Sequence, residues 1–208
     1  WVIYTTKTTD IAKYPNVHRR LLPFKELLAR KREVQLGRQP WYSLHWPRKK
    51  ENFERAPKIL VQAIRNLSLK RRVVATLDTS GLFADHTLFV LYARATDMDL
   101  HLVLGILNSR LVNYLFTRKY VDINIKGKYL QSIPLPKTTS EDSRVGEVAQ
   151  LARELLRLRT ACKASKTEHD RSQLERQFDT ADKQIDQLVY ELYGLTDEEI
   201  RIVEEATK

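Results

Sequence analysis

The chain has 208 residues, of which 42% are hydrophobic, so it is long and apolar enough for one large domain or two small ones. Charged residues make up 30%, a share below that of disordered chains, and the net charge of +10 predicts an anionic partner. Cys162 is the only cysteine, which excludes an internal disulfide and a cysteine-based zinc site. No apolar run approaches the roughly 20 residues that span a bilayer. We therefore expect a cytoplasmic protein without a membrane partner and, because the sequence opens on Trp1 rather than Met, a segment of a longer chain.

The charge is unevenly distributed along the chain. Residues 1–136 hold 24 Lys and Arg against 10 Asp and Glu, a balance of +14, and residues 137–208 hold 12 against 16, a balance of −4. A basic body followed by a mildly acidic tail indicates two different tasks. The alternative is an ordinary basic protein whose positive surface binds nothing in particular.

The first third of the chain predicts a helix and a strand. Asn16 is a suitable N-cap for a helix that runs to about Arg32, although Pro23 would kink or break it. The aromatic-rich segment 41–46 predicts a short strand, and the charged segment 47–52 predicts a loop.

Three further strands are predicted over residues 59–64, 72–77 and 87–93. The segment 78–81 supplies the turn of a hairpin, because Gly81 tolerates a positive φ and Asp and Ser side chains cap turns. Strands of this length with a glycine turn predict a small antiparallel or mixed sheet.

A leucine-rich helix is predicted to start at Asp97 or Asp99 and to run to about Arg118. Asn108 falls within its apolar stripe, so its amide needs a partner and we expect a structural hydrogen-bonding role. A basic irregular segment follows, and residues 130–135 are predicted to be extended.

The polar segment after residue 136 marks the expected boundary between a basic domain over 1–136 and a helical hairpin or spacer over 137–208. Apolar residues in 148–162 and 174–192 recur every three or four positions, which predicts two helices paired as an antiparallel, coiled-coil-like hairpin. Gly194 should end the second helix, and Thr196 with Glu199 should form a capping box for a short last helix.

No pattern of catalytic residues is visible in the sequence. There is no glycine-rich phosphate loop, no zinc-binding histidine pattern and no nucleophile with a plausible base, and the five histidines are scattered. We therefore predict no catalytic residue, no metal ligand and no cofactor within this chain.

Several short motifs occur in an order that resembles the TaqI-like specificity domain at the C-terminal end of type IIG restriction-modification enzymes. They are Trp41-Tyr42-Ser43-Leu44, Pro57-Lys58-Ile59-Leu60, the turn Asp78-Thr79-Ser80-Gly81, Leu104-Gly105-Ile106-Leu107-Asn108-Ser109, Ile133-Pro134-Leu135-Pro136 and, in the tail, Leu188-Val189-Tyr190-Glu191-Leu192-Tyr193-Gly194-Leu195-Thr196. A related arrangement, a recognition domain followed by a helical spacer, occurs in the specificity subunits of type I systems. The resemblance extends from about Pro15 to Glu204.

This resemblance implies an α+β target-recognition domain that grips duplex DNA and carries no chemistry of its own. A separate methyltransferase domain, upstream in such enzymes, would be its partner in the parent chain, a DNA adenine methyltransferase or type II restriction enzyme. S-adenosylmethionine, and Mg²⁺ where a nuclease is present, would be cofactors of that parent. Members of the family differ most in the residues that read bases, so the recognised sequence cannot be transferred.

A DNA-binding domain needs cations for the phosphates and a few donors and acceptors for base edges, and both are available on predicted loops. Three cationic clusters are expected to line one cleft: Arg48-Lys49-Lys50, then Lys70-Arg71-Arg72, and third Arg118-Lys119 with Lys126 and Lys128. Polar loop residues among them are candidates for reading bases. The predicted DNA-binding residues are Arg48, Lys49, Lys50, Asn52, Arg55, Lys70, Arg71, Arg72, Thr79, Ser80, Arg118, Lys119, Asn124, Lys126 and Lys128. For Thr79 and Ser80, ordinary turn chemistry is an equally good interpretation.

Four residues carry further expectations. Trp41, Tyr42 and Trp46 are expected to fill the core rather than stack on DNA, and Lys58 is expected to extend its ammonium group to the surface. Two rival functions remain open at this point. One is an RNA- or protein-binding scaffold that uses the basic face and the helical hairpin, and the other is a nuclease fragment with an unrecognised site.

Overall fold

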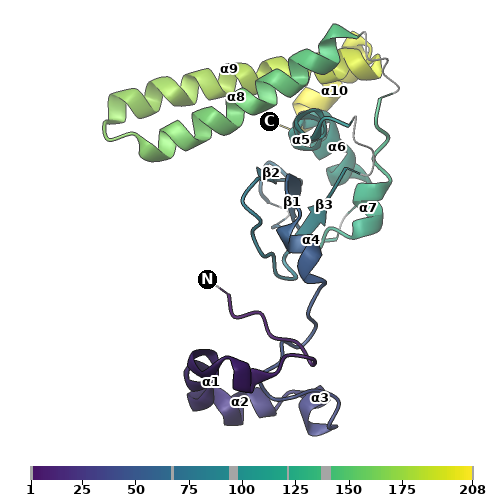
Figure 1. Cartoon of the computed structure of the whole chain (residues 1–208). Helices are drawn as coiled ribbons and strands as arrows, with labels where there is room; N and C mark the ends of the chain where they lie inside the picture. Colours follow the sequence, from purple (N-terminus) through teal and green to yellow (C-terminus); the bar gives the residue numbers. More distant parts are fainter. Residues whose placement is uncertain (1, 67, 94–97, 121, 137–141, 208) are drawn as a thin grey trace. The chain divides into compact units, whose positions relative to one another are not determined.

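The computed structural model describes residues 2–66, 68–93, 98–120, 122–136 and 142–207 (Figure 1). It divides into two compact units, Trp1–Arg55 and Ala56–Lys208. The expected boundary after residue 136 adjoins residues outside the described ranges, and the functional division that it marks stays a prediction.

The first unit is built from short helices. Its elements are η1 (Ile11–Lys13), α1 (Pro15–Leu21), η2 (Leu22–Phe24), α2 (Lys25–Ala29), α3 (Arg32–Gln35) and α4 (Lys50–Glu54). The single helix predicted from Asn16 to Arg32 is wrong, because the chain tightens into a 3₁₀ turn at Pro23, which has no N–H to continue an α-helical ladder.

The strand predicted for residues 41–46 is also wrong. This segment forms turns, in which Ser43 N–H donates to the Pro40 carbonyl at 3.1 Å. Trp41 and Tyr42 are half-buried and meet edge to face with ring centroids 5.6 Å apart, whereas Trp46 is 77% exposed. The aromatic side chains of this segment therefore do not share the alternating environment of a strand, and the core position expected for Trp46 is wrong.

The second unit is an α+β structure around a three-stranded antiparallel sheet, as predicted. The strands are β1 (Lys58–Gln62), β2 (Ala75–Asp78) and β3 (Leu88–Leu91), in the order β2-β1-β3. Both β2 and β3 pair with β1, so the hairpin predicted over residues 78–81 is wrong: this segment opens a crossover that carries the chain past β1. Gly81 does adopt a positive φ of 77°, as expected for a turn.

A buried ion pair joins β1 to β2. Lys58 is fully buried, and its Nζ lies 2.5 Å from Oδ2 of Asp78, its partner in the strand register. The expectation that Lys58 would reach the surface is wrong, because a carboxylate inside the fold satisfies its charge. Burial alone would raise the pKa of Asp78, but hydrogen bonds from Lys58, Ser80 and Leu82 outweigh it and lower this pKa to about 2.

The long leucine-rich helix is interrupted at Ser109. It forms α5 (Leu100–Asn108), which Asp99 caps, and α6 (Arg110–Lys119), which begins where Ser109 becomes extended and accepts a hydrogen bond from Val112 N–H. A serine near the middle of a predicted helix thus serves as an N-cap, a role that serine favours.

Asn108 takes the structural role predicted for it. Its side-chain amide accepts from Ala75 N–H at 2.9 Å and donates to the Ala75 carbonyl at 3.1 Å. Asn113 acts alongside it and accepts from Val73 N–H at 2.9 Å. The two asparagines therefore satisfy backbone groups at the start of β2 and just before it, which would otherwise be unpaired at the edge of the sheet.

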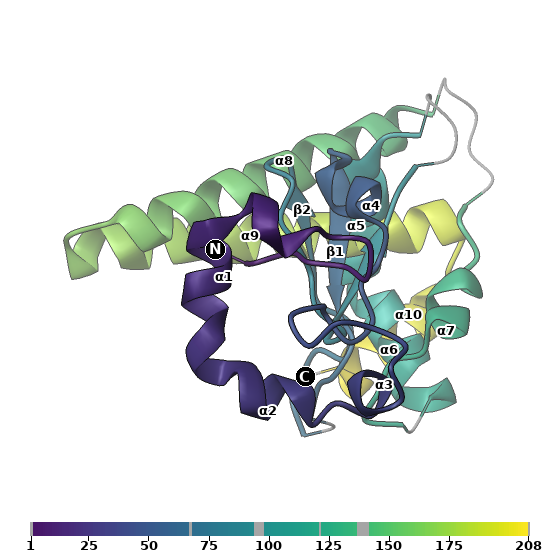
Figure 2. The same ribbon diagram turned by 60° about the horizontal axis from the view of Figure 1, so that its bottom comes forward.

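The C-terminal helices form the predicted hairpin, α8 (Ser143–Ala164) and α9 (Glu168–Tyr193), followed by α10 (Asp197–Ala206). Gly194 ends α9 in the left-handed conformation, and Thr196 and Glu199 form the predicted capping box. Part of the hairpin completes the core, because Val148, Ala152, Ile185 and Val189 pack with residues of β1, α5 and α6. The end where α8 meets α9 extends beyond the sheet (Figures 1 and 2).

Close packing between α5 and α8 depends on Gly105. A Cβ atom at this position would lie 2.7 Å from Cγ1 of Val148, so any larger residue would force Val148 or one of the two helices to shift. The residues predicted to be extended after position 130 are helical at first, in α7 (Gly127–Gln131).

Within the described residues, no helix combines the length and the apolar character that a membrane crossing requires.

Candidate nucleic-acid interface

The third predicted cationic cluster is assembled around two stacked tyrosines at the end of α6 and the start of α7. The rings of Tyr120 and Tyr129 lie 3.8 Å apart and 13° from parallel. Lys119 Nζ lies 5.6 Å from the centroid of Tyr120, and the ammonium groups of Lys126 and Lys128 lie 5.5 Å and 5.7 Å from that of Tyr129. We call this set the basic–aromatic patch, and it consists of Arg118, Lys119, Tyr120, Lys126, Lys128 and Tyr129.

Asp122 fixes the loop that carries the patch. Its Oδ2 accepts from the Tyr129 hydroxyl at 2.6 Å and lies 2.9 Å from Lys126 Nζ, and these two donors lower the pKa of Asp122. One of the three ammonium charges is therefore already paired, whereas Lys119 and Lys128 are exposed and contact the tyrosine rings. Arg118 is exposed as well and lies over Tyr114 at 5.7 Å.

Arg72 was predicted to contact DNA, but it is buried in the structure, with 2% of its surface exposed. Its guanidinium donates to the backbone carbonyls of Arg65 and Asp122. Arg72 therefore ties the turn before β2 to the loop of the basic–aromatic patch, and this position removes it from the candidate DNA contacts. Burial, and then the charge of Arg65, lower its pKa.

The neighbours of Arg72 in the second predicted cluster differ in exposure. Lys70 is exposed on the turn that precedes β2. Arg71 is half-exposed and paired with Asp182 of α9, and its guanidinium also donates to the Asn108 carbonyl at 3.3 Å. Only Lys70 of this cluster thus presents an exposed cation.

Asn124 lies beside the extension of β1. It forms an antiparallel bridge with Ile64, and Ile125 N–H donates to the Ala63 carbonyl at 2.7 Å. The Asn124 residue is exposed, next to the basic–aromatic patch in sequence. A rigid backbone thus presents an amide side chain at the surface, which suits a residue that reads an adenine edge.

The turn after β2 is held by Asp78. Its Oδ1 accepts from both the backbone N–H and the hydroxyl of Ser80, at 2.9 Å and 2.8 Å, and its Oδ2 accepts from Leu82 N–H at 2.7 Å. Ser80 therefore performs the turn chemistry that was the alternative interpretation, whereas Thr79 is exposed at the tip.

The remaining predicted contacts lie in the first unit. Its five candidates are all exposed, and Lys50 Nζ lies 2.8 Å from Glu54 Oε1, one turn along α4. They are Arg48, Lys49, Lys50, Asn52 and Arg55. A single cleft shared with the clusters of the second unit stays a prediction.

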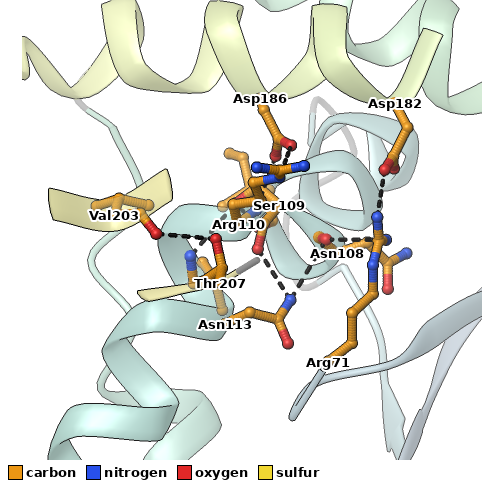
Figure 3. Close-up of polar contacts among 11 residues, drawn as sticks. Arg71, Asn108, Ser109, Arg110, Asn113, Asp182, Asp186, Val203 and Thr207 are labelled. Carbon is orange, nitrogen blue, oxygen red and sulfur yellow. Dashed lines mark hydrogen bonds and ion pairs between the residues drawn. The ribbon is translucent and has the colours of Figure 1, made fainter. Parts of the chain in front are cut away.

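Two ion pairs join α9 to the turn before β2 and to the start of α6, and neither was predicted from the sequence (Figure 3). Arg71 pairs with Asp182, and Arg110 Nε lies 3.3 Å from Oδ2 of Asp186. The carboxylate of Asp186 also accepts from Arg110 N–H at 2.7 Å, at the first turn of α6. Asp182 and Asp186 are thus inward-facing partners of basic residues. In the sequence, only their positions three residues before and one residue after the apolar Ile185 indicated burial.

The environment of Asp186 disfavours its charge. The residue is 5% exposed, and burial raises its pKa to about 6, helped by the nearby charge of Asp182 and opposed by Arg110 and Arg71. Tyr190 is buried on the same helix, and burial raises the pKa of its hydroxyl as well.

Within the described part of the chain, no three His, Cys, Asp or Glu side chains gather where they would hold a metal ion. What the second unit does offer is a surface of exposed lysines, stacked tyrosines and an amide, carried on backbone that Arg72 and Asp122 fix.

Comparison with known proteins identifies this architecture. No curated protein matches the chain. A family model, the TaqI-like C-terminal specificity domain, matches residues 10–135, which include the sheet, α5, α6 and the basic–aromatic patch. This match spans more than half of the 208 residues. The chain therefore belongs to the family of TaqI-like C-terminal specificity domains.

Proposed function

We propose that this chain recognises a specific sequence in double-stranded DNA for a restriction-modification enzyme and is not itself catalytic. Membership of the family implies DNA target recognition in such enzymes. The observation that carries the proposal to particular residues is the basic–aromatic patch, because it concentrates exposed cations in the matched region.

Phosphate binding is assigned to the exposed cations. Lys119, Lys126 and Lys128 each lie within 5.7 Å of a ring centroid of the stacked pair, and we assign phosphate contacts to them, with Lys126 exchanging its partner Asp122 for a phosphate. Lys70 is assigned a phosphate contact as well, because it is exposed on a turn that Arg72 ties to the same loop. Contacts of this kind give affinity and orientation without sequence preference.

Base reading is assigned to exposed polar side chains on fixed backbone. Asn124 is the strongest candidate, because an amide pairs with both the N6 and N7 positions of adenine and its backbone is held by Ala63 and Ile64, which follow β1. Thr79 is a second candidate at the tip of the turn that Asp78 holds. Asn52 and Arg55 of the first unit remain candidates on exposure alone.

The helical hairpin is proposed to contact protein rather than DNA. Its half nearest the core closes the fold, while the end that extends beyond the sheet is available to a methyltransferase domain of the parent chain. Residues 143–193 hold 9 basic and 9 acidic residues, so the hairpin lacks the positive excess that a phosphate backbone attracts.

Replacing Lys119, Lys126 and Lys128 together with alanine is expected to weaken binding to duplexes of every sequence. Each phosphate contact contributes about −0.9 to the slope of log K against log salt, so losing three should make the slope less negative by about 2 to 3. Fluorescence anisotropy with a labelled duplex across a salt series measures this slope.

The matched control replaces the exposed lysines Lys163, Lys166 and Lys183 of the hairpin, which changes the net charge by the same amount. This control should leave the slope unchanged. Equal slopes for both triple variants and the unmutated chain would remove the basic–aromatic patch from the interface. Tighter binding to RNA than to any duplex would favour the scaffold alternative instead.

A further inference from the structure

A second surface, in the first unit, combines an exposed tryptophan with cations around one hollow. The hollow has a volume of about 1060 Å³, and its lining includes Trp46, five Lys or Arg residues and two Glu residues. Trp46 is 77% exposed, the largest exposed fraction among the bulky hydrophobic residues that the structure describes. An indole ring left in water beside an excess of positive charge suits a ligand with both an apolar ring and a negative backbone.

The segment that carries Trp46 is anchored on both sides. Before it, Leu44 N–H donates to the Thr5 carbonyl at 2.9 Å, and after it the Tyr4 hydroxyl donates to the Arg48 carbonyl. The Thr5 hydroxyl also donates to the Tyr42 carbonyl at 2.5 Å. The loop is thus bonded to residues 4 and 5 at two points, two residues before and two residues after Trp46. Its backbone is already fixed, so ordering the loop costs little free energy on binding.

The immediate neighbours of Trp46 complete a stacking surface. The His45 ring lies 5.3 Å from the indole at an interplanar angle of 31°. Arg48, Lys49 and Lys50 follow within four positions and are exposed. A nucleotide chain matches this arrangement, because its bases have π-faces and its phosphates are spaced for successive cations.

We propose that Trp46 stacks on an unpaired or unstacked base of the bound DNA, while the cations beside it hold the flanking phosphates. This inference rests on the proposed function and assigns a positioning residue to it. Stacking of one base on an aromatic side chain is worth about 5- to 150-fold in affinity. It releases no counterions, so it contributes nothing to the dependence on salt.

The test compares Trp46→Ala, Trp46→Phe and the unmutated chain, each titrated with a mixed-sequence 30-base-pair duplex at several salt concentrations. Trp46→Ala is expected to weaken binding about 5- to 150-fold with an unchanged salt slope, and Trp46→Phe, which keeps a ring, should recover most of the loss. Phe24→Ala is the matched control, because Phe24 is an exposed aromatic residue of the same unit, 50% exposed and outside the hollow.

Fluorescence gives an independent readout. In a background with both Trp1→Phe and Trp41→Phe, DNA binding should quench the emission of the remaining Trp46, and adding Trp46→Phe should abolish that signal. Affinity unaltered by Trp46→Ala, or emission from Trp46 unaltered by bound DNA, would overturn the stacking proposal while leaving sequence recognition intact. Failure of the unmutated chain to bind any duplex would overturn the proposed function instead.

Discussion

Replacing Lys58 with methionine is expected to lower the free energy of unfolding by about 3–5 kcal/mol, the cost of leaving one member of a buried ion pair without its partner. Lys58 and Asp78 are both buried, and their charged atoms lie 2.5 Å apart between β1 and β2. Methionine fills similar space but leaves the Asp78 carboxylate uncompensated. Urea denaturation at pH 7, followed by circular dichroism, measures the loss.

The matched control is Lys50→Met, which breaks an exposed lysine pair with Glu54. Exposed pairs contribute about 0–1 kcal/mol, so this variant should keep nearly all of its stability. Asp78 also holds the turn at Ser80 and Leu82, so hydrogen exchange at these amides should accelerate in Lys58→Met. A loss below about 1 kcal/mol would contradict the account of Lys58 as a required partner of Asp78.

Replacing Asp186 with asparagine is expected to raise the free energy of unfolding, relative to the unmutated chain, by more at neutral pH than at acid pH. The pKa of Asp186 is raised from 3.8 to about 6, so between these values the native state binds more protons than the unfolded state. Rising pH therefore destabilises the native state through this group, with the full cost present above about pH 6. At 1.36 kcal/mol per pKa unit, the shift corresponds to about 3 kcal/mol.

Asparagine keeps an oxygen that can accept from Arg110 N–H and cannot ionise. The difference in unfolding free energy between Asp186→Asn and the unmutated chain should therefore grow by about 3 kcal/mol, in favour of the variant, from about pH 3.5 to pH 7.5. Asp179→Asn, at an exposed position of the same helix, should show no such growth. A difference that is constant with pH for Asp186→Asn would show that this carboxyl is not desolvated.

Features with local causes could be predicted from the sequence. Gly194 ends a helix because it adopts a positive φ at little cost, and Thr196 with Glu199 caps the next helix through contacts three residues apart. Asn108 was predicted to be structural because a polar amide inside an apolar stripe must find a partner. The paired C-terminal helices followed from hydrophobic periodicity, whereas the α+β class was expected from the family resemblance.

Features that depend on distant partners could not be predicted in the same way. Lys58 is buried because Asp78, 20 positions later, faces it across two strands, and its own neighbours gave no sign of this. Arg72 is buried because its guanidinium reaches the Asp122 carbonyl, which lies 50 positions away. The order of the strands likewise depends on the whole sheet, so a turn signal at Gly81 does not establish that the flanking strands pair.

The same distinction applies to the candidate interface. Clusters of Lys and Arg in the sequence identified the cations of the basic–aromatic patch. They also included Arg71, which pairs with Asp182 of α9, and Arg72, which is buried. Stacking of Tyr120 on Tyr129 was missed, because the eight residues between them must turn back before the rings can meet.

Selection of bound duplexes from a random-sequence pool, followed by measurement of affinity for the enriched duplex and for single-base changes in it, tests the central claim most directly. The chain should enrich one short sequence, and each single change within it should weaken binding by about 5- to 150-fold. Enrichment of no sequence, with equal affinity for all duplexes, would contradict the assignment of this chain as a reader of DNA sequence.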